Sequence, residues 1–175
     1  MKETDWQHKT ARLRLRKFSM QDRQFVISLV NDPQWIAHIG DRNVHDETQA
    51  EAFIKDGPLS CYRNHGFGMY IFESLTDNTP MGVCGLLQRD YLDKPDIGYA
   101  ILPQFRGQGL TFEACQGVLQ HDVSRYSLDT VYATISPLNK ASIKLIERLG
   151  FEFSKLIEPT NQQSLLYIKR NFDAR

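Results

Sequence analysis

The sequence has no apolar run long enough to cross a membrane, and its first ten residues, MKETDWQHKT, contain no apolar stretch of the kind that a signal peptide needs. It has no excess of charge either, because 21 Lys and Arg residues balance 21 Asp and Glu residues. A chain with zero formal net charge has no general attraction to nucleic acid or to an anionic membrane. We therefore expect a cytoplasmic protein that binds neither nucleic acid nor membrane.

Cysteine and histidine are too sparse and scattered for a disulfide framework or a metal site. Cys61, Cys84 and Cys115 are odd in number and form no C-x-x-C pair. The five histidines show no metal-ligand spacing. The sequence therefore predicts no metal site, and we expect the cysteines to be small buried thiols.

Two common phosphate-binding motifs are missing as well. No G-x-x-x-x-G-K-[ST] loop occurs, and the G-x-G-x-x-G pattern fails because Phe112 stands where the third glycine belongs. Nucleotide binding through either motif is therefore disfavoured.

The hydrophobic pattern predicts one domain over residues 1–175, because no repeat, low-complexity segment or Pro/Ser-rich linker divides the chain. Helices are expected up to Asn31-Asp32-Pro33, from Asp46 to Gly57-Pro58, from Gly109 to Tyr126 and from Asn139 to Leu149. Strands are expected around Leu13–Leu15 and at Phe67–Phe72, Met81–Leu87, Asp96–Leu102, Thr130–Ile135, Phe151–Ile157 and Leu165–Lys169. This order predicts an α/β fold around one mixed sheet.

The first strand follows a short N-terminal lead and alternates leucines with Arg12, Arg14 and Arg16. A period of two fits an edge or half-exposed strand, so we expect the arginines to form its solvated face. Ser19 and Asp22 then resemble a capping box that opens the first helix.

The most informative segment is IGYAILPQFRGQGL at residues 97–110, where a strand runs into a glycine-rich turn that opens a helix. Glycines let the backbone approach a phosphate closely, and the unpaired N–H groups and dipole of a helix start favour an anion. Arg106 can supply a counter-charge. A G-x-G turn before a helix is also common without any ligand, so the segment alone leaves both interpretations open.

Gln104-x-x-Gly107-x-Gly109 resembles the Q/R-x-x-G-x-G/A signature of the GNAT acetyltransferases. The flanking IGYAILPQFRGQGLTFEA is similar to the Rim-type branch, which acetylates N-termini of ribosomal proteins, and NKASIKLIERLGF at 139–151 resembles that branch's N-x-x-S…L-G-F block. Weaker similarities lie in RLRLR and MGVCGL, so the resemblance covers nearly the whole chain. It implies the GNAT fold, a mostly antiparallel, twisted sheet of about seven strands flanked by about four helices.

The resemblance also implies an acetyl-CoA-dependent enzyme in which a primary amine attacks the thioester directly in a ternary complex. The turn would hold the pyrophosphate of coenzyme A, and the end of the preceding strand would pair with the pantetheine amides. Asn139 would bind the pantetheine arm, although it is equally placed to cap its helix. The implied cofactor-binding residues are Ile101, Leu102, Gln104, Arg106, Gly107, Gln108, Gly109, Leu110, Thr111 and Asn139.

For catalysis, many family members carry a tyrosine acid on the last helix, where this sequence has Ile146. The Rim-type branch uses an earlier serine, which Ser142 matches; the alternative is that Ser142 only bonds back to its own helix. Asp96 takes the place of the family's glutamate base and is short enough to need a water, and it also fits a turn end after Pro95. We expect Tyr99 to face the opposite side as core or cleft lining.

By the same resemblance, Trp35, in the stretch 35–40 between the first two helices, would shape the acceptor pocket, and His65 would contact the substrate. A loop tryptophan is equally often a plug in the core. The implied partner is an amine, and a ribosomal-protein N-terminus, an amino sugar, a polyamine and an antibiotic are all candidates. A sensor that binds acyl-CoA without turnover is the alternative function, and the chain is expected to be a monomer or homodimer.

Overall fold

The computed structural model describes residues 7–159, 161–170 and 172, so residues 1–6 of the expected N-terminal lead lie outside the described part. The strands are β1 (Gln7–Lys9), β2 (Leu13–Arg16), β3 (Met69–Ser74), β4 (Pro80–Leu87), β5 (Asp96–Ile101), β6 (Thr130–Ile135), β7 (Glu152–Ile157) and β8 (Ser164–Arg170). The α-helices are α1 (Arg23–Val30), α2 (Pro33–His38), α3 (Glu47–Asp56), α4 (Pro58–His65), α5 (Leu110–Arg125) and α6 (Lys140–Arg148). Among the described residues, no helix has both the length and the apolar character that crossing a bilayer requires.

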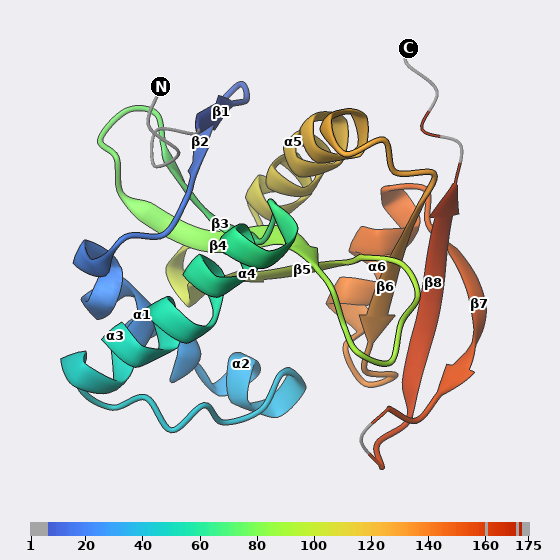
Figure 1. The fold of residues 1–175 in the computed structure, drawn as a ribbon, viewed down its shortest axis with the longest axis horizontal. Helices are drawn as coiled ribbons and strands as arrows, with labels where there is room; N and C mark the ends of the chain where they lie inside the picture. The colour runs from blue at the N-terminus through green and yellow to red at the C-terminus, as the bar shows by residue number, and fades with distance from the viewer. Residues whose placement is uncertain (1–6, 160, 171, 173–175) are drawn as a thin grey trace.

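One mixed sheet organises the molecule, with the strand order β1-β2-β3-β4-β5-β6-β8-β7. Every neighbouring pair is antiparallel except β5 and β6, which are parallel. Helices α5 and α6 cover one face of the sheet, and α1–α4 cover the other face over its N-terminal half (Figure 1). The α/β class and the mostly antiparallel sheet are therefore confirmed.

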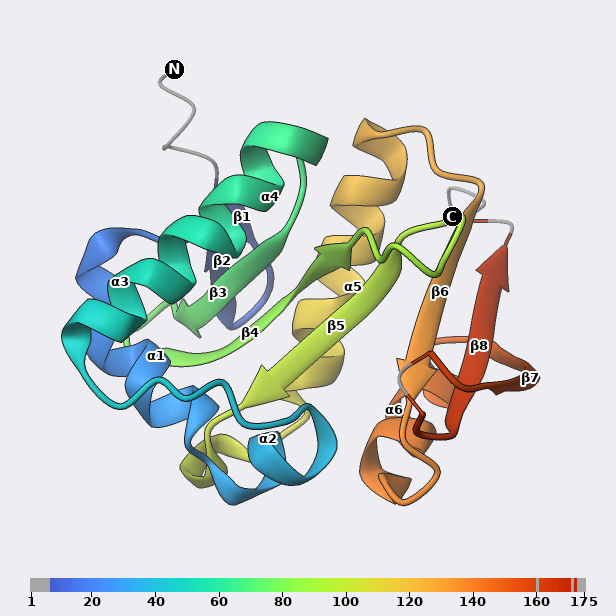
Figure 2. The ribbon, with the colours of Figure 1, turned by 60° about the horizontal axis from the view of Figure 1, so that its bottom comes forward.

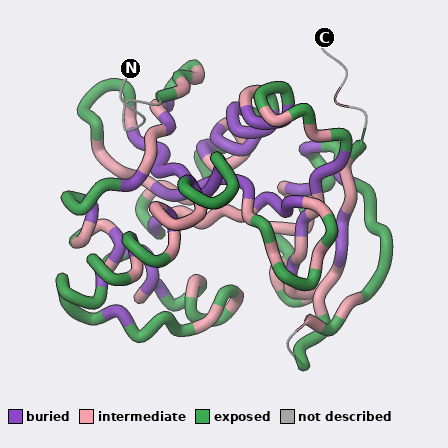
Figure 3. Tube along the Cα trace, viewed as in Figure 1, coloured by how far each residue is buried: buried purple, intermediate pink, exposed green. Residues whose placement is uncertain are grey.

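Each face of the sheet has its own core. Leu13, Leu15 and Phe72 pack with Ala114 and Val118 of α5 on one side. On the other side, side chains from β3 and β4 pack with helices α1 and α3. Buried residues run through the central strands and α5, whereas the edge strand β7 is exposed along most of its length (Figure 3).

The parallel strands β5 and β6 meet at one point and then separate. Their register holds a single pair, Asp96 opposite Tyr132, and the Tyr132 N–H donates to the Pro95 carbonyl at 2.9 Å. Beyond this pair the two strands diverge, with α2 near the free end of β5 and α6 near the free end of β6 (Figure 2). The divergence splits the sheet and leaves one edge of β5 without a neighbouring strand.

The described residues hold eight strands and six α-helices, more than the sequence predicted, and two of the additional helices begin at a proline. Asn31-Asp32-Pro33 ends α1 as expected, but Pro33 also starts α2, so the stretch at 35–40 is largely helical rather than a loop. Pro58 likewise starts α4 where the second helix was expected to end. Proline fits the first helical position because a backbone N–H there would have no partner within the helix, so proline loses no helical hydrogen bond.

β2 lies between β1 and β3, so it is not an edge strand, but its alternation of buried leucines with partly exposed arginines confirms the half-exposed alternative. The two arginines on it form ion pairs instead of a freely solvated face. Arg14 and Arg16 donate from Nε to the Glu73 carboxylate of β3 at 2.6 and 2.8 Å, and the Glu73 side chain is only 2% exposed. Arg16 also binds Asp22 at 2.8 Å. The prediction of a solvated face was wrong because the partner acid, Glu73, lies on a strand far away in the sequence.

Candidate functional site

The glycine-rich turn has the geometry of an anion-binding helix start. Gly107 and Gly109 both have φ of +74°, which L side chains rarely adopt, and Gly109 caps α5 without a side-chain hydrogen bond. Among the described residues, none accepts a hydrogen bond from the backbone N–H groups of Gly107 to Thr111. Such unpaired amides at the positive end of a 16-residue helix form a ready site for phosphate.

Two arginines stand beside this turn in different roles. Arg12 donates from Nη1 to the Gln108 carbonyl at 3.0 Å and from Nε to Glu113 at 2.6 Å, which fixes the turn to the start of β2. Burial raises the pKa of Glu113, but hydrogen bonds from Thr10 and Arg12 outweigh it and hold that pKa below its usual value. Arg12 remains half exposed at 51% and brings a cation to the turn that the sequence did not single out.

Arg106, the second arginine, is paired with a different carboxylate from the one that Arg12 binds. Its guanidinium forms an ion pair with Asp32 and donates to the Ile101 carbonyl at 3.2 Å. Asp32 is buried and caps α2 by accepting from the N–H groups of Gln34 and Trp35. The Arg106 side chain therefore ties the turn to α2 and to the end of β5, and its role as a phosphate ligand stays a prediction.

The free edge of β5 offers backbone groups next to the turn. The Leu102 N–H donates to the Met81 carbonyl at 2.9 Å, and the Leu102 carbonyl accepts from Phe105 at 3.1 Å, so both backbone groups of Leu102 are used within the chain. Because backbone groups alternate sides along a strand, those of Tyr99 and Ile101 point toward the opening between β5 and β6. An extended amide chain can pair with this edge as an additional strand would.

The start of α6 lies on the other side of this opening. Asn139 caps the helix, and its Oδ1 accepts from the Ser142 N–H at 3.1 Å, which confirms the capping role. Among the described residues, no hydrogen bond involves the Ser142 hydroxyl, so the alternative in which it bonds back to its own helix is not seen. Ile146 occupies the position at which the resembled family often carries a tyrosine, and its side chain is fully buried.

Tyr99 reaches from β5 to the first turn of α6. Its hydroxyl donates to the Ser142 carbonyl at 3.3 Å, and burial raises the pKa of the phenol. Tyr99 packs against the core on the α5 side of the sheet, which agrees with the core alternative of its predicted position. Strand alternation in the sequence was enough to predict which face of β5 the Tyr99 side chain lies on, whereas its contact with α6 depends on the tertiary fold.

Asp96 lies at the point where β5 and β6 part, and it is almost fully buried. Its carboxylate accepts from Arg89 Nε at 3.0 Å and from Thr134 Oγ1 at 3.1 Å. Burial raises the pKa of Asp96, and the guanidinium of Arg89 opposes that rise. Arg89 and Thr134 are partners that the sequence did not indicate, because neither belongs to a motif.

The structure does not place all predicted site residues together. Side chains alternate along β5, so Asp96 points to the face that carries α1–α4, whereas Tyr99 points toward α5 and α6. Asp96 and Ser142 therefore approach the opening from opposite faces of the sheet. Gln104 is exposed in the one-turn helix Pro103–Phe105 just before the turn.

The two predicted acceptor residues differ in their positions. Trp35 lies on α2, packs against the core of the α1–α3 side, and has a buried indole N–H without a partner among the described residues. His65 is exposed at the end of α4 and stacks on Phe67 at 5.9 Å. The adjacent Gly66 carbonyl accepts from Tyr126, which follows α5, so His65 lies at the end of α5 remote from the glycine turn.

Comparison with known proteins gives a consistent result. The model of the acetyltransferase (GNAT) domain family matches residues 12–152. The chain is 28% identical over 152 residues to p20, an uncharacterised N-acetyltransferase of Bacillus licheniformis, covering 85% of this chain and 83% of that protein.

Solved structures share the fold. A protein from Bordetella pertussis assigned to the GNAT family of acetyltransferases is 25% identical, with a TM-score of 0.79 over 94% of this chain and 99% of that one. An acetyl transferase from Salmonella typhimurium that modifies the N-terminal serine of ribosomal protein L7/L12 is 18% identical, with a TM-score of 0.78 over 93% and 96% of the two chains. At that identity the second likeness concerns the fold alone.

Proposed function

Because the chain belongs to the GNAT acetyltransferase family, we propose that it is an acetyl-CoA-dependent N-acetyltransferase that moves an acetyl group to a primary amine. The main support is the row of unpaired amides from Gly107 to Thr111 at the start of α5, beside the free edge of β5. The amides suit a pyrophosphate and the strand edge suits the amides of a pantetheine arm. Ile101 is the better placed of the two predicted strand residues. Both backbone groups of Leu102 are bonded within the chain, whereas at Ile101 only the carbonyl accepts a hydrogen bond, from Arg106.

The proposed reaction is direct attack in a ternary complex. The amine nitrogen forms a bond to the thioester carbonyl carbon, the carbon–sulfur bond breaks, the amine loses a proton and coenzyme A leaves as a thiol. Asp96 takes the proton through a water, because its short side chain is almost fully buried. Ser142 supplies a proton to the sulfur, and its hydroxyl without a partner among the described residues supports that role.

The acceptor is an amine-bearing molecule, and a ribosomal-protein N-terminus remains a candidate because the Salmonella typhimurium protein with this fold modifies one. We propose no metal in the reaction, since the residues given roles in it are hydroxyls, carboxylates and backbone groups. The alternative function is an acyl-CoA sensor without turnover.

Thiol release from acetyl-CoA tests the proposal. The protein is incubated with acetyl-CoA and a panel of N-terminal peptides, polyamines, amino sugars and aminoglycosides, and calorimetry with acetyl-CoA alone runs beside it. Thiol release with any amine supports the enzyme and identifies its acceptor class. Binding of acetyl-CoA without thiol release for the whole panel favours the sensor, and no binding overturns the proposal.

The two catalytic assignments have a separate test. Ser142→Ala is expected to lower kcat by about ten- to a hundredfold with unchanged acetyl-CoA affinity, since general acid catalysis contributes on that scale. Asp96→Asn should also lower kcat and remove the acidic limb of the pH profile. Unchanged turnover in Ser142→Ala would return Ser142 to a structural role.

A further inference from the structure

A hollow of about 410 Å³ lies on the C-terminal wing of the sheet, between the loop that joins β4 to β5 and the strands β6, β8 and β7. Its floor consists of Tyr132, Leu166 and Ile168, which lie on the face opposite α6. Its walls come from the β4–β5 loop and from the end of β7. The lining residues with polar or charged ends are Tyr91, Asp93, Tyr132, Ser154, Lys155 and Glu158.

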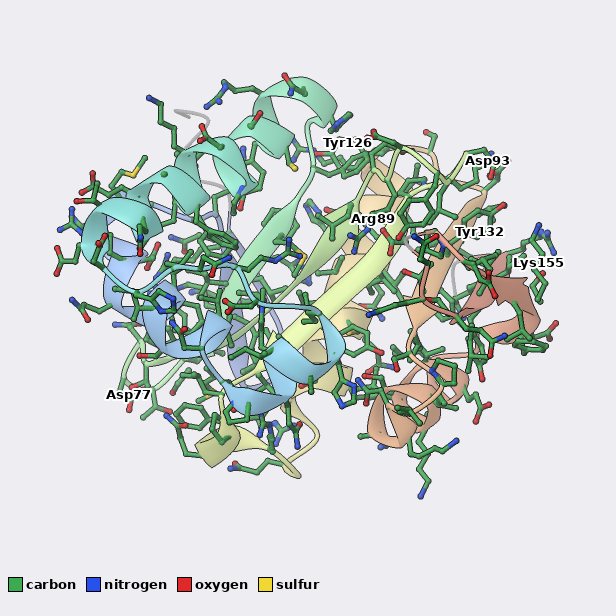
Figure 4. The ribbon with its side chains drawn as sticks, turned by 90° about the horizontal axis from the view of Figure 1, so that it is seen from below. Asp77, Arg89, Asp93, Tyr126, Tyr132 and Lys155 are labelled. Atoms are coloured by element: carbon green, nitrogen blue, oxygen red, sulfur yellow. The ribbon has the colours of Figure 1, made fainter. Side chains whose placement is uncertain are left out.

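The hollow begins beside the proposed base. Tyr132 in its floor is directly opposite Asp96 in the register of β6 and β5. Thr134, which donates to the Asp96 carboxylate, pairs with Leu166, another floor residue. Figure 4 shows Arg89 near β5, with Asp93, Tyr132 and Lys155 following toward β7 on the same side of the molecule. An acceptor whose reacting amine lies next to Asp96 can therefore place the remainder of the molecule in the hollow.

The charged groups of the hollow favour a cation. Asp93 and Glu158 are both exposed, while Lys155 is the single cation among the lining residues. Tyr132 donates to Asp93 at 3.1 Å, which aims one carboxylate oxygen at the floor and leaves the other available. In the described part of the chain, neither Lys155 nor Glu158 forms an ion pair.

The aromatic residues of the hollow also favour a cation. Tyr91 and Tyr132 are among the residues that line the hollow, and the face of an aromatic ring attracts an ammonium or guanidinium group. The apolar floor residues, Leu166 and Ile168, fit the methylene chain that would join two amines.

We propose that this hollow selects acceptors that carry a second cationic group besides the amine that reacts, as in a diamine or a longer polyamine. The inference rests on the proposed function, because it assigns the rest of the acceptor to a place next to Asp96. The second ammonium keeps its proton and lies between Asp93, Glu158 and the tyrosine rings. Lys155 opposes it and limits the affinity.

Cadaverine and pentylamine provide a matched pair of acceptors, because they have the same carbon chain and differ in the second amine. Cadaverine has two equivalent amines that can react, which alone gives a twofold advantage. The wild-type protein is therefore expected to use cadaverine with a kcat/KM more than twice that of pentylamine. Asp93→Asn and Glu158→Gln should each lower the ratio of the two kcat/KM values by about three- to fivefold, the size expected of one exposed charge pair. Lys155→Gln should raise that ratio by a similar factor.

The opposite signs distinguish charge recognition from damage to the fold. Asp77→Asn is the control variant, because Asp77 is an exposed acid in the β3–β4 turn, far from the hollow (Figure 4). It should leave the ratio unchanged. A wild-type ratio of about two or less, or a fall of the ratio in Lys155→Gln, would overturn the inference.

Failure of this inference is separable from failure of the proposed function. Turnover of pentylamine and cadaverine with equal kcat/KM per reactive amine rejects the cation site and retains the acetyltransferase. If no amine releases thiol, NMR titration with pentylamine, which is an ammonium cation at neutral pH, against the uncharged 1-pentanol still tests the hollow through the ring signals of Tyr91 and Tyr132. Shifts with pentylamine alone support the site, and identical responses to the amine and the alcohol reject it.

Discussion

Replacement of Asp32 by Asn separates two roles of one carboxylate. Asp32 caps α2 through the N–H groups of Gln34 and Trp35 at 3.1 and 3.2 Å, and it pairs with Arg106 of the glycine turn. Asn caps a helix about as well as Asp, so the substitution chiefly removes the ion pair. The side chain of Asp32 is 5% exposed and that of Arg106 is 29% exposed.

The expected cost follows from this burial. Removing one partner of a fully buried pair costs about 3–5 kcal/mol. Since Arg106 is partly exposed, water recovers part of its hydration, and we expect a loss of about 2 kcal/mol in the free energy of unfolding. For a chain of this length, that loss corresponds to a fall in Tm of about 4–8 °C.

Urea unfolding measures the loss, and Asp46→Asn is the matched control. Asp46 caps α3 by accepting from the Gln49 N–H at 2.8 Å, and it has no ion pair in the described ranges. Its substitution should cost about 0.5 kcal/mol or less. A loss for Asp32→Asn no larger than that for Asp46→Asn would refute the ion-pair argument, and a double-mutant cycle with Arg106→Gln would locate the coupling.

Two further substitutions test the N-terminal part of the sheet. Glu73→Gln should lower the free energy of unfolding by about 3 kcal/mol, because Arg14 and Arg16 lose a shared buried partner. Glu51→Gln, whose side chain is 48% exposed, should change it by less than about 0.5 kcal/mol in the same urea assay, and equal losses would contradict the argument. Burial and the charge of His121 lower the pKa of His8, so the contribution of His8 to stability is complete above the unfolded pKa of about 6.5 and declines as the pH falls through the lower folded value. His8→Gln should therefore flatten the loss of stability on acidification, and an unchanged pH dependence of urea unfolding would contradict it.

Local signals in the sequence were sufficient for much of the fold. The limits of β6 agree with the predicted Thr130–Ile135, because alternation and flanking turns define a short strand. The capping box of Ser19 and Asp22 is present, and Asp46 caps α3 as expected. Gly150 follows α6 with a φ of +83°, as the sequence predicted for the end of that helix.

Proline was the main source of error in the helical region. The same residue ends one helix and can open the next, and only the preceding cap distinguishes the two. Asp32 carries that signal at Pro33, because its side chain accepts from two N–H groups of α2. At Pro58 the preceding Gly57 provides no side-chain cap, so the sequence contains no comparable sign of α4.

The site could be predicted where it is local and not where it depends on distant contacts. The glycine turn and the Asn139 cap are formed by residues close in sequence. The pairing of Arg106 with Asp32 and that of Asp96 with Arg89 and Thr134 require strands and loops to come together. The hollow beside β6 combines a loop and three strands, none of which carries a motif.

Calorimetric titration of acetyl-CoA into the wild-type protein and into Gly107→Trp tests most directly that the turn at the start of α5 holds the cofactor. A Cβ at Gly107 would meet nothing within 4 Å, so the change strains the backbone rather than a contact at Cβ. Gly40, with φ of +106° and an equally open Cβ position, provides the control Gly40→Trp. The account predicts that Gly107→Trp remains folded and loses acetyl-CoA binding, while Gly40→Trp retains it. Wild-type affinity in folded Gly107→Trp, or no binding by the wild-type protein, would contradict it.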